Sequence, residues 1–520
     1  MERDATTRPV INPWIIAITV MLSTFLEVLD TSVVNVSLPY IAGGLSATID
    51  ESTWVLTSYL VANAIVLPIT GWLANQFGRK RLLIAAVSGF TLFSLLCGIA
   101  PSLPLLILFR CLQGAFGGAL QPISQAVLLE TFPPEDRGKA MAFWGLGIVV
   151  APILGPALGG WLTDTYSWRW VFYINLPIGI ASVIMTKMFL FDPHYIKPRS
   201  NKVDGWGLGM LAVGVAALQI MLDKGQEADW FSSHLIVLLA AAAVVLLVGF
   251  VVWELKTKDP IVDLRVFKDR TYATGVFLMS TLGFVLYGAL VLLPLFMQEL
   301  LGYSAITAGL WTAPRGIGAL IFMPLTGILL SKKWDPRILL VLGLASASFG
   351  PWTFSHFNLN AGPWAFFIPQ IVQGAGLSFI FVPLTTVTMD AIPLKDMGNA
   401  TSLFNLMRNL GSAMGISVVE TLVTRRAQFH QSRLTAQISS SNPMLQHLQQ
   451  SFQQMLIARG MDATTAARQA LAAVYLMVQK QSLLLSYVEA FFVLAIIFWL
   501  MAPLVMLMKR PSHSRSVSAH

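Results

Sequence analysis

WIIAITVMLSTFLEVLDTSVVNVSL, residues 14–38, is the first hydrophobic stretch of the chain. At about 1.5 Å of rise per residue, a helix of this length crosses the hydrocarbon core of a bilayer with room for tilt. Glu27 and Asp30 interrupt it three residues apart, so they lie on one helical face. A charged side chain at the centre of a membrane helix costs roughly 2.5–3.5 kcal/mol. We therefore expect Asp30, and after it Glu27, to carry protons; the alternative is a neutral acid that only packs helices together.

The composition is that of a polytopic membrane protein. Of the 520 residues, 55% are hydrophobic and 12% are charged, whereas soluble proteins carry about 25% charged residues. Spanning segments must satisfy their own backbone hydrogen bonds, so the predicted fold class is all-α. The positive-inside rule accounts for the net charge of +8, and no nucleic-acid partner is expected. Cys97 and Cys111 lie in apolar stretches and are expected to pack rather than to form a disulfide or a metal site.

Long apolar runs predict fourteen transmembrane helices. Their expected ranges are 14–38, 54–74, 82–100, 104–128, 139–163, 168–191, 205–223, 234–253, 271–299, 305–330, 337–356, 363–388, 398–424 and 485–508. Lys and Arg gather in alternate connecting segments, beginning with the N-terminus. Both termini are therefore expected in the cytoplasm.

A long polar interruption, residues 425–482, precedes the last predicted span and falls on the outer side in this topology. It is rich in Gln, and Leu445 and Phe452 belong to an apolar pattern with helical spacing. Gly460 and Asp462 are typical of a helix stop and the next N-cap. The segment is interpreted either as a helix pair resting on the membrane surface or as a docking surface for an external partner.

Arg110 lies inside the fourth predicted span, in RCLQGAFGGA, residues 110–119. A guanidinium there must find a carboxylate, carbonyl groups or water. Arg110 and Asp30 both fall toward the outer ends of their spans, so an ion pair between them is feasible. The alternative is an Arg that joins helices through backbone carbonyls. Gln113 and Asn35 are candidates to hydrogen-bond cargo or water.

The later part of the chain adds two more intramembrane cations, Arg315 and Arg408. Together with Asn405 they are candidates to line the cavity, either by binding a substrate anion or by organising the second bundle. Glu420 and Glu489 are expected to lie near helix ends and to be solvated.

Two further stretches carry glycines and prolines. GWLANQFGRKR, residues 71–81, predicts a tight turn whose basic cluster contacts anionic headgroups. APILGPALGG, residues 151–160, predicts a bent helix whose small residues let two backbones touch.

Taken in order, these stretches resemble the major facilitator superfamily, and within it the fourteen-span drug:proton antiporters of the EmrB/QacA type, most of all the EmrB branch. LDTSVVNVSLP at 29–39 and WRWVFYINLPIG at 168–179 add to the resemblance. The resemblance implies a conformational role for the turn and for span five, at Gly71, Asn75, Gly78, Arg79, Pro152, Gly155, Pro156, Gly159 and Gly160. The family usually has an acid where this chain has Asn75, and that acid helps latch the cytoplasmic side. The amide implies either a weaker latch or another contact in its place.

The resemblance also implies two six-helix bundles of inverted repeats with two extra helices between them. The expected division is a cytoplasmic N-terminus 1–13, a first bundle 14–191, a linker with two helices 192–258, a second bundle 259–508 that includes the segment 425–482, and a cytoplasmic C-terminus 509–520.

The activity implied is proton-driven export of lipophilic or amphipathic compounds by alternating access, from a bacterial inner membrane. Asp30 would couple the proton, Arg110 would modulate it and Glu27 would be a second site. The proton is the coupling ion, and no cofactor or metal is expected. The family's EmrB branch works with a periplasmic adaptor, EmrA-like, and an outer-membrane channel.

Other classes remain as alternatives. No G-x-x-x-x-G-K-[ST], HExxH or GxSxG motif is present, which argues against an ATP-driven pump and against an enzyme. The strongest alternative is a proton-coupled exporter of one endogenous metabolite, fatty acid or siderophore. A membrane sensor that binds ligand without transporting it is a third possibility.

Overall fold

The computed structural model describes residues 12–192, 204–437 and 443–508. Within these ranges the chain folds into helices joined by short turns, and no strand occurs. The stretches that lie outside the described residues are 1–11 and 509–520 of the expected cytoplasmic tails, 193–203 of the expected linker and 438–442 of the expected external segment.

The helices form two packed groups with a helix pair between them in the sequence. The first group, called here the first half, contains α1 (Pro13–Gly44), α2 (Ile49–Phe77), α3 (Arg79–Gly98), α4 (Leu103–Gly117), α5 (Leu120–Thr131), α6 (Arg137–Thr165), α7 (Trp170–Tyr173) and α8 (Asn175–Phe189). The pair is α9 (Gly205–Lys224) and α10 (His234–Lys256). The second half contains α11 (Arg270–Leu295), α12 (Ala305–Thr312), α13 (Pro314–Ser331), α14 (Pro336–Phe354), α15 (Phe367–Asp390), α16 (Met397–Gln437), α17 (Pro443–Ala458) and α18 (Ala463–Val505).

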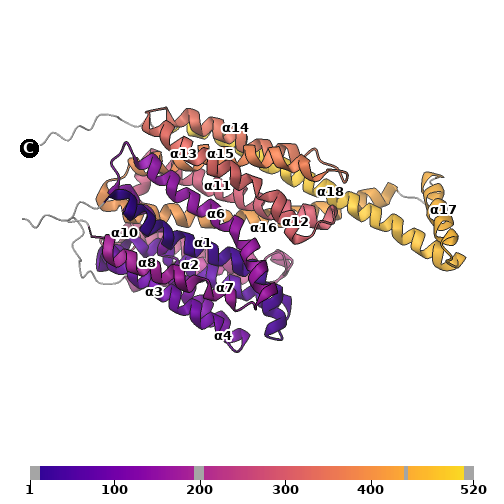
Figure 1. Cartoon of the computed structure of the whole chain (residues 1–520), viewed down its shortest axis with the longest axis horizontal. Coiled ribbons are helices and arrows are strands. Elements are labelled where there is room, and N and C mark those ends of the chain that lie inside the picture. The colour runs from indigo at the N-terminus through magenta and orange to yellow at the C-terminus, as the bar shows by residue number, and fades with distance from the viewer. Residues whose placement is uncertain (1–11, 193–203, 438–442, 509–520) are drawn as a thin grey trace, which may run out of the picture.

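Figure 1 shows the second half above the first, with α6 and α16 among the helices that lie where the halves meet. The contacts between the halves run through α6 with α13 and α15, and through α16 with α2 and α5. The α9–α10 pair packs beside α2, and α9 also contacts α16. Two bundles that meet along a few helices are the arrangement expected of a transporter whose halves rock around a central site.

Thirteen helices in the described part of the chain are long and apolar enough to cross a membrane. They coincide with thirteen of the expected spans. The remaining expected span, 398–424, lies in α16, whose Asn405 and Arg408 are buried in the bundle. Because α16 packs between α11, α18 and α2, it takes its place among the spanning helices despite its polar side chains. The protein is a multi-pass membrane protein.

Local sequence explains how α2 and α4 are placed. Thr48 and Glu51 form a capping box at the start of α2, with Thr48 N–H donating to Glu51 Oε2 over 2.8 Å. Gly114 lets α4 approach α2 closely, because a Cβ there would lie 2.3 Å from the Tyr59 carbonyl oxygen. The close approach brings Arg110, one helical turn before Gly114, against α2.

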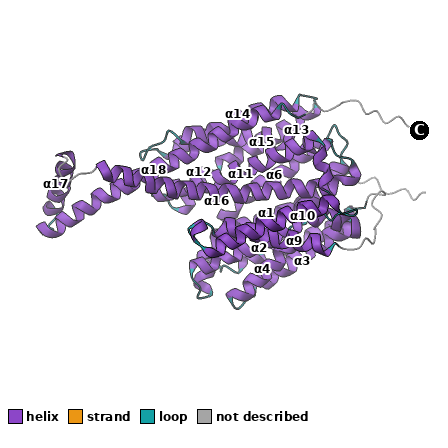
Figure 2. Ribbon diagram, turned by 180° about the vertical axis from the view of Figure 1, so that it is seen from behind, coloured by secondary structure: helices purple, strands orange, loops and turns teal. Residues whose placement is uncertain are grey.

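The described part of the segment 425–482 projects from the bundle. α16 continues without a break to Gln437, and α18 begins at Ala463, so two spanning helices extend out of the bundle together. Figure 2 shows α17 far from the bundle, joined to the outer end of α18. The segment is therefore a projecting helical hairpin and does not lie flat against the bundle. The predicted stop at Gly460 and the predicted N-cap at Asp462 are confirmed, since Thr465 N–H donates to Asp462 over 2.9 Å.

Candidate functional site

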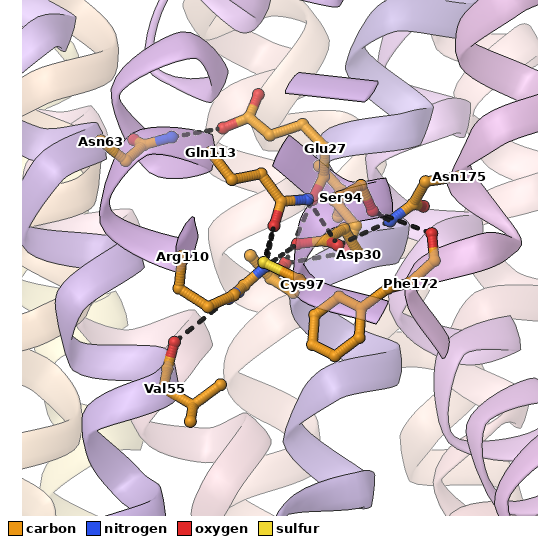
Figure 3. Close-up of polar contacts among 12 residues, drawn as sticks. Glu27, Asp30, Val55, Asn63, Ser94, Cys97, Arg110, Gln113, Phe172 and Asn175 are labelled. Atoms are coloured by element: carbon orange, nitrogen blue, oxygen red, sulfur yellow. Dashed lines mark hydrogen bonds and ion pairs between the residues drawn. The ribbon is translucent and has the colours of Figure 1, made fainter. Parts of the chain in front are cut away.

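Asp30, on α1, lies at the centre of a fully buried polar cage (Figure 3). Arg110 Nη1, on α4, donates to Asp30 Oδ2 over 2.6 Å. Gln113 Nε2 and Asn175 Nδ2 donate to Asp30 Oδ1 over 3.1 and 2.6 Å. All three partners are donors, which is what a carboxylate, an acceptor-only group, requires. The structure thus brings together Asp30, Arg110 and Gln113, three of the residues that the sequence singles out.

Arg110 is held by groups on two other sides. Its Nε donates to the Val55 carbonyl over 3.1 Å, and its Nη1 also donates to Gln113 Oε1 over 2.8 Å. Its guanidinium lies 4.2 Å from the centroid of the Tyr59 ring, a cation–π geometry. Both interpretations of Arg110 are therefore realised at once, because it pairs with the acid and also bonds a backbone carbonyl of α2.

Asn175 completes the cage and was not among the predicted site residues. Besides Asp30, its Nδ2 contacts Ser94 Oγ at 3.0 Å, and Ser94 Oγ donates to the Phe172 carbonyl over 2.8 Å. Asn175 lies within the stretch 168–179 that supports the family resemblance. A buried amide at the first residue of a spanning helix was the available signal, but only the fold shows that it reaches Asp30.

A second buried cluster surrounds Glu27 and draws on both halves. Asn63 Nδ2, on α2, donates to Glu27 Oε1 over 2.9 Å. Glu27 also interacts with Gln121 on α5 and with Arg408 on α16. Arg408 in turn donates from Nη2 to Gln121 Oε1. Glu27 and Asp30 are three residues apart, yet they face different partners: Asp30 contacts only the first half, whereas Glu27 faces a cation of the second.

The neighbouring turn of α16 repeats this kind of contact between two amides. Asn405 Nδ2 donates to Gln125 Oε1 over 2.6 Å, and both side chains are fully buried. Gln121 and Gln125 are four residues apart and lie on one face of α5. Two glutamines at that spacing in an apolar helix were a signal for a contact face, and the sequence interpretation did not use it.

Arg315 and Asn35 stand apart from both clusters. Arg315, near the start of α13, is half-buried, and no acid of the described residues lies within ion-pair distance of it. Tyr287 interacts with Arg315 and also with Arg408. Asn35 is exposed and lies eight residues beyond Glu27 on α1, about a quarter-turn away from the face that carries Glu27.

Comparison with known proteins places these features in a family. A model described as Major Facilitator Superfamily matches residues 20–416 of the chain. The chain belongs to the major facilitator superfamily. It is therefore a membrane transporter and not an enzyme.

Individual relatives agree over most of the length. The chain is 42% identical to Multidrug export protein EmrB of Haemophilus influenzae, over 83% of this chain and 84% of that protein. It is 40% identical to Fatty acid resistance protein FarB of Neisseria gonorrhoeae, over 95% of each chain. The crystal structure of the proton:xylose symporter XylE aligns with a TM-score of 0.59 at 15% identity, over 96% of each chain, and supports the fold.

The superfamily's turn between α2 and α3 joins the two halves at the end of the bundle where α1 begins and α18 ends. A Cβ on Gly71 would lie 2.6 Å from the backbone nitrogen of Asn399, so only glycine allows α2 and α16 to touch there. Gly78 has a φ of +83°, which favours glycine. Arg79 is buried and forms an ion pair with Glu130 of α5, whereas Asn75 is exposed. The turn's cation thus has its acid within the first half, from α5 rather than from position 75.

The superfamily's proline- and glycine-rich stretch packs α6 on α1. A Cβ on Gly155 would lie 2.1 Å from Ser32 Oγ, and one on Gly159 would lie 2.9 Å from the Val33 carbonyl oxygen. Ser32 Oγ also donates to the carbonyl oxygen of Pro152 over 3.3 Å. The α6 helix continues through both Pro152 and Pro156. Gly160 meets no atom within 4 Å, so it has no part in this packing.

Proposed function

We propose that the protein is a proton-driven multidrug efflux antiporter that exports lipophilic or amphipathic compounds by alternating access. The observation that supports this most is the Asp30 cage: a carboxyl group with no exposed surface, held by one cation and two amides inside a membrane helix bundle. Because such a group is costly in a membrane, an intramembrane acid is a functional candidate. EmrB, a relative over most of the chain, is named for multidrug export.

In this proposal the arrangement seen in the structure is the deprotonated one, since every contact of Asp30 comes from a donor. Protonation removes the charge that Arg110 faces and frees the guanidinium to shift. The release of a proton from Asp30 and the binding of cargo favour the same orientation of the halves. Reprotonation from the opposite side favours release of the cargo.

The test is drug-induced proton movement in proteoliposomes carrying an imposed pH gradient. Wild type should discharge the gradient when a lipophilic drug is added. Asp30→Asn should still bind drug but should move no protons. Glu420→Gln is the matched control, because Glu420 is an exposed acid on a spanning helix. Normal coupling in Asp30→Asn would show that Asp30 is structural. A wild type that moves no protons with any compound would show that the proton gradient does not drive transport.

We further propose that the projecting hairpin of α16, α17 and α18 docks a periplasmic adaptor, so that the protein is the inner-membrane pump of a tripartite system with an outer-membrane channel. Support comes from the side chains that the hairpin exposes along α18: Leu471, Tyr475 and Leu476 are each about half exposed, at 57%, 49% and 55%. Apolar side chains gathered on a projecting surface mark an interaction site.

Replacing Leu471 and Leu476 with Glu should abolish co-purification of the adaptor while drug transport in vesicles persists. Gln469→Glu, an exposed polar neighbour, controls for the added charge. Undiminished co-purification of the double variant would exclude this face of the hairpin.

A second candidate function is export of one amphipathic acid, such as a fatty acid. Arg315 has no acid partner among the described residues, and Tyr287 acts electrostatically on both Arg315 and Arg408, so a substrate carboxylate bound near Tyr287 would meet two cations. The relative FarB is named for fatty acid resistance. A panel of acidic, neutral and cationic compounds separates the candidates: transport of a single acid, lost in Arg315→Gln, would favour the second.

A further inference from the structure

The Glu27 cluster contains a link between the two halves that passes through one neutral side chain. Arg408 Nη2 donates to Gln121 Oε1, and Gln121 also interacts with Glu27. Glu27, Gln121 and Arg408 are all more than nine-tenths buried. No acid among the described residues forms an ion pair with Arg408, so the amide is the group that connects this cation to the carboxyl of α1.

The orientation of the Gln121 amide is fixed by its two neighbours, because one end of an amide accepts hydrogen bonds and the other end donates them. Arg408 can only donate, so it requires the carbonyl oxygen of Gln121. The NH₂ group of Gln121 is then available to Glu27, whose Oε2 has no hydrogen-bond partner within the described residues, and an ionised carboxylate is its best acceptor. Protonation of Glu27 would remove the charge that the Gln121 amide faces, and the amide would then hold Arg408 less firmly, because linked polar groups polarise one another.

Several polar atoms of the Glu27 cluster have no hydrogen-bond partner in the described part of the chain, so the cluster is not a fully satisfied hydrogen-bond network. Glu27 Oε2, Arg408 Nε and Arg408 Nη1 have no hydrogen-bond partner within the described residues. The Asp30 cage differs in its acid: both carboxylate oxygens of Asp30 are bonded, and every partner belongs to the first half, although Arg110 Nη2 and Asn175 Oδ1 have no partner within the described residues. A change of charge at Asp30 is therefore confined to one half, whereas a change at Glu27 reaches the contact between halves.

We infer that Gln121 is a positioning residue that couples the protonation of Glu27 to the contact between the two halves at Arg408. This inference rests on the proposed proton-driven transport. It gives the two acids of α1 different roles: Asp30 carries the transported proton, and Glu27 controls the contact between the halves. The titratable and charged groups that act on Glu27 are Asp30 on its own helix, Tyr59 on α2 and Arg408 on α16. Arg110 on α4 acts through its ion pair with Asp30.

The test compares Gln121→Leu with Gln125→Leu. Both remove a hydrogen bond between α5 and α16, but only Gln121 also interacts with an acid, Glu27. In proteoliposomes, Gln121→Leu should move the midpoint of the pH–transport profile to higher pH by about one unit, the size expected when an ionised carboxylate loses one donor. Gln125→Leu should lower the rate at every pH without moving the midpoint. Gln121→Leu added to Glu27→Gln should change nothing further, whereas additive effects would overturn the inference.

A second measurement keeps the inference separate from the proposed function. Spin labels on α5 and α16 report the distance between the halves as pH is varied, with no drug or gradient present. Wild type should show a pH-dependent distance distribution that Glu27→Gln and Gln121→Leu abolish and Gln125→Leu retains. If wild type fails to move protons but shows this dependence, the antiporter proposal fails and the link through Gln121 stands. A dependence that survives in Gln121→Leu overturns the link.

Discussion

Arg137, at the start of α6, donates from Nη1 to Asp390 Oδ1, at the end of α15, over 2.9 Å, and so ties the first half to the second. Arg137 is also fixed by its own half, because its Nε donates to the Leu129 carbonyl over 2.9 Å. The pair lies at the end of the bundle where Gly71 of α2 meets Asn399 of α16. The ion pair thus joins the two halves at this end of the bundle.

Asp390→Asn should therefore favour the state in which this end is open. The Asp390 side chain is 37% exposed, so the ion pair is partly screened and the expected shift in the ratio of the two states is roughly two- to fivefold. Labelling of a single cysteine introduced beside Gly71 measures the shift. Asp136→Asn, which breaks an exposed pair with Lys139 inside the same helix turn, should leave labelling unchanged.

Gly71→Ala should destabilise the closed contact between α2 and α16. The added methyl group would fall 2.6 Å from Asn399 N, on backbone that cannot move aside without shifting a helix. Overpacking of this kind costs about 1–3 kcal/mol, so we expect a lower midpoint of thermal unfolding and slower transport. Gly43→Ala is the control, since a Cβ there meets nothing within 4 Å. Equal behaviour of the two variants would contradict the close packing.

The Asp30–Arg110 pair should show strong non-additivity. Arg110→Met leaves a buried carboxylate without its cation, and breaking a buried pair in this way costs about 3–5 kcal/mol. Asp30→Leu combined with Arg110→Met removes both charges and should unfold at a higher temperature than Arg110→Met alone, although neither variant should transport. The measurement is the midpoint of thermal unfolding in detergent. If the double variant unfolds at a lower temperature than Arg110→Met alone, the prediction is contradicted and the ion pair itself stabilises the fold.

Asp462 should keep the tip of the hairpin ordered down to acidic pH. The hydroxyl of Thr464 and the backbone N–H of Thr465 donate to its carboxylate and lower its pKa. A lowered folded-state pKa gives a stabilisation that is complete above the unfolded pKa of about 3.9 and is lost as pH falls through the folded value. The cap is therefore intact throughout the neutral and weakly acidic range. Asp462→Ala should raise amide hydrogen exchange at 463–467 at pH 7, and unchanged exchange there would contradict the cap's role.

The sequence predicted the spanning helices and the Asp30–Arg110 contact for a simple physical reason. A helix in lipid must be long and apolar, and a charge inside it must find a partner, so both features are written in residue type and spacing. The proximity of Glu27 to Arg408 could not be predicted, because Arg408 lies in the other half and only the packing of α5 against α16 brings the two near each other. Asn175 was missed for the same reason, since it meets Asp30 from another helix.

The ends of the hairpin helices could not be predicted from the sequence, for a different reason. Hydropathy marks where a helix leaves the membrane and not where the helix ends, and the Arg- and Gln-rich residues after 424 are good helix formers. The expected helix end near Glu489 was wrong for this reason: it lies in the interior of α18, where Arg426 Nη2 donates to its Oε1 over 2.7 Å. Glu420 likewise lies in the interior of its helix, α16, although its side chain is exposed as expected.

Because α16 is one uninterrupted helix, a change of its tilt inside the bundle also moves the projecting hairpin. One helix carries both Arg408, at the contact between the halves, and Gln437, at the outer end of the projecting part, 29 residues further on. At about 1.5 Å per residue the two positions are about 44 Å apart, so a tilt of about 10° around Arg408 moves the far end by about 8 Å. A small rotation of α16 at the contact between the halves therefore displaces the tip of the hairpin by several ångströms.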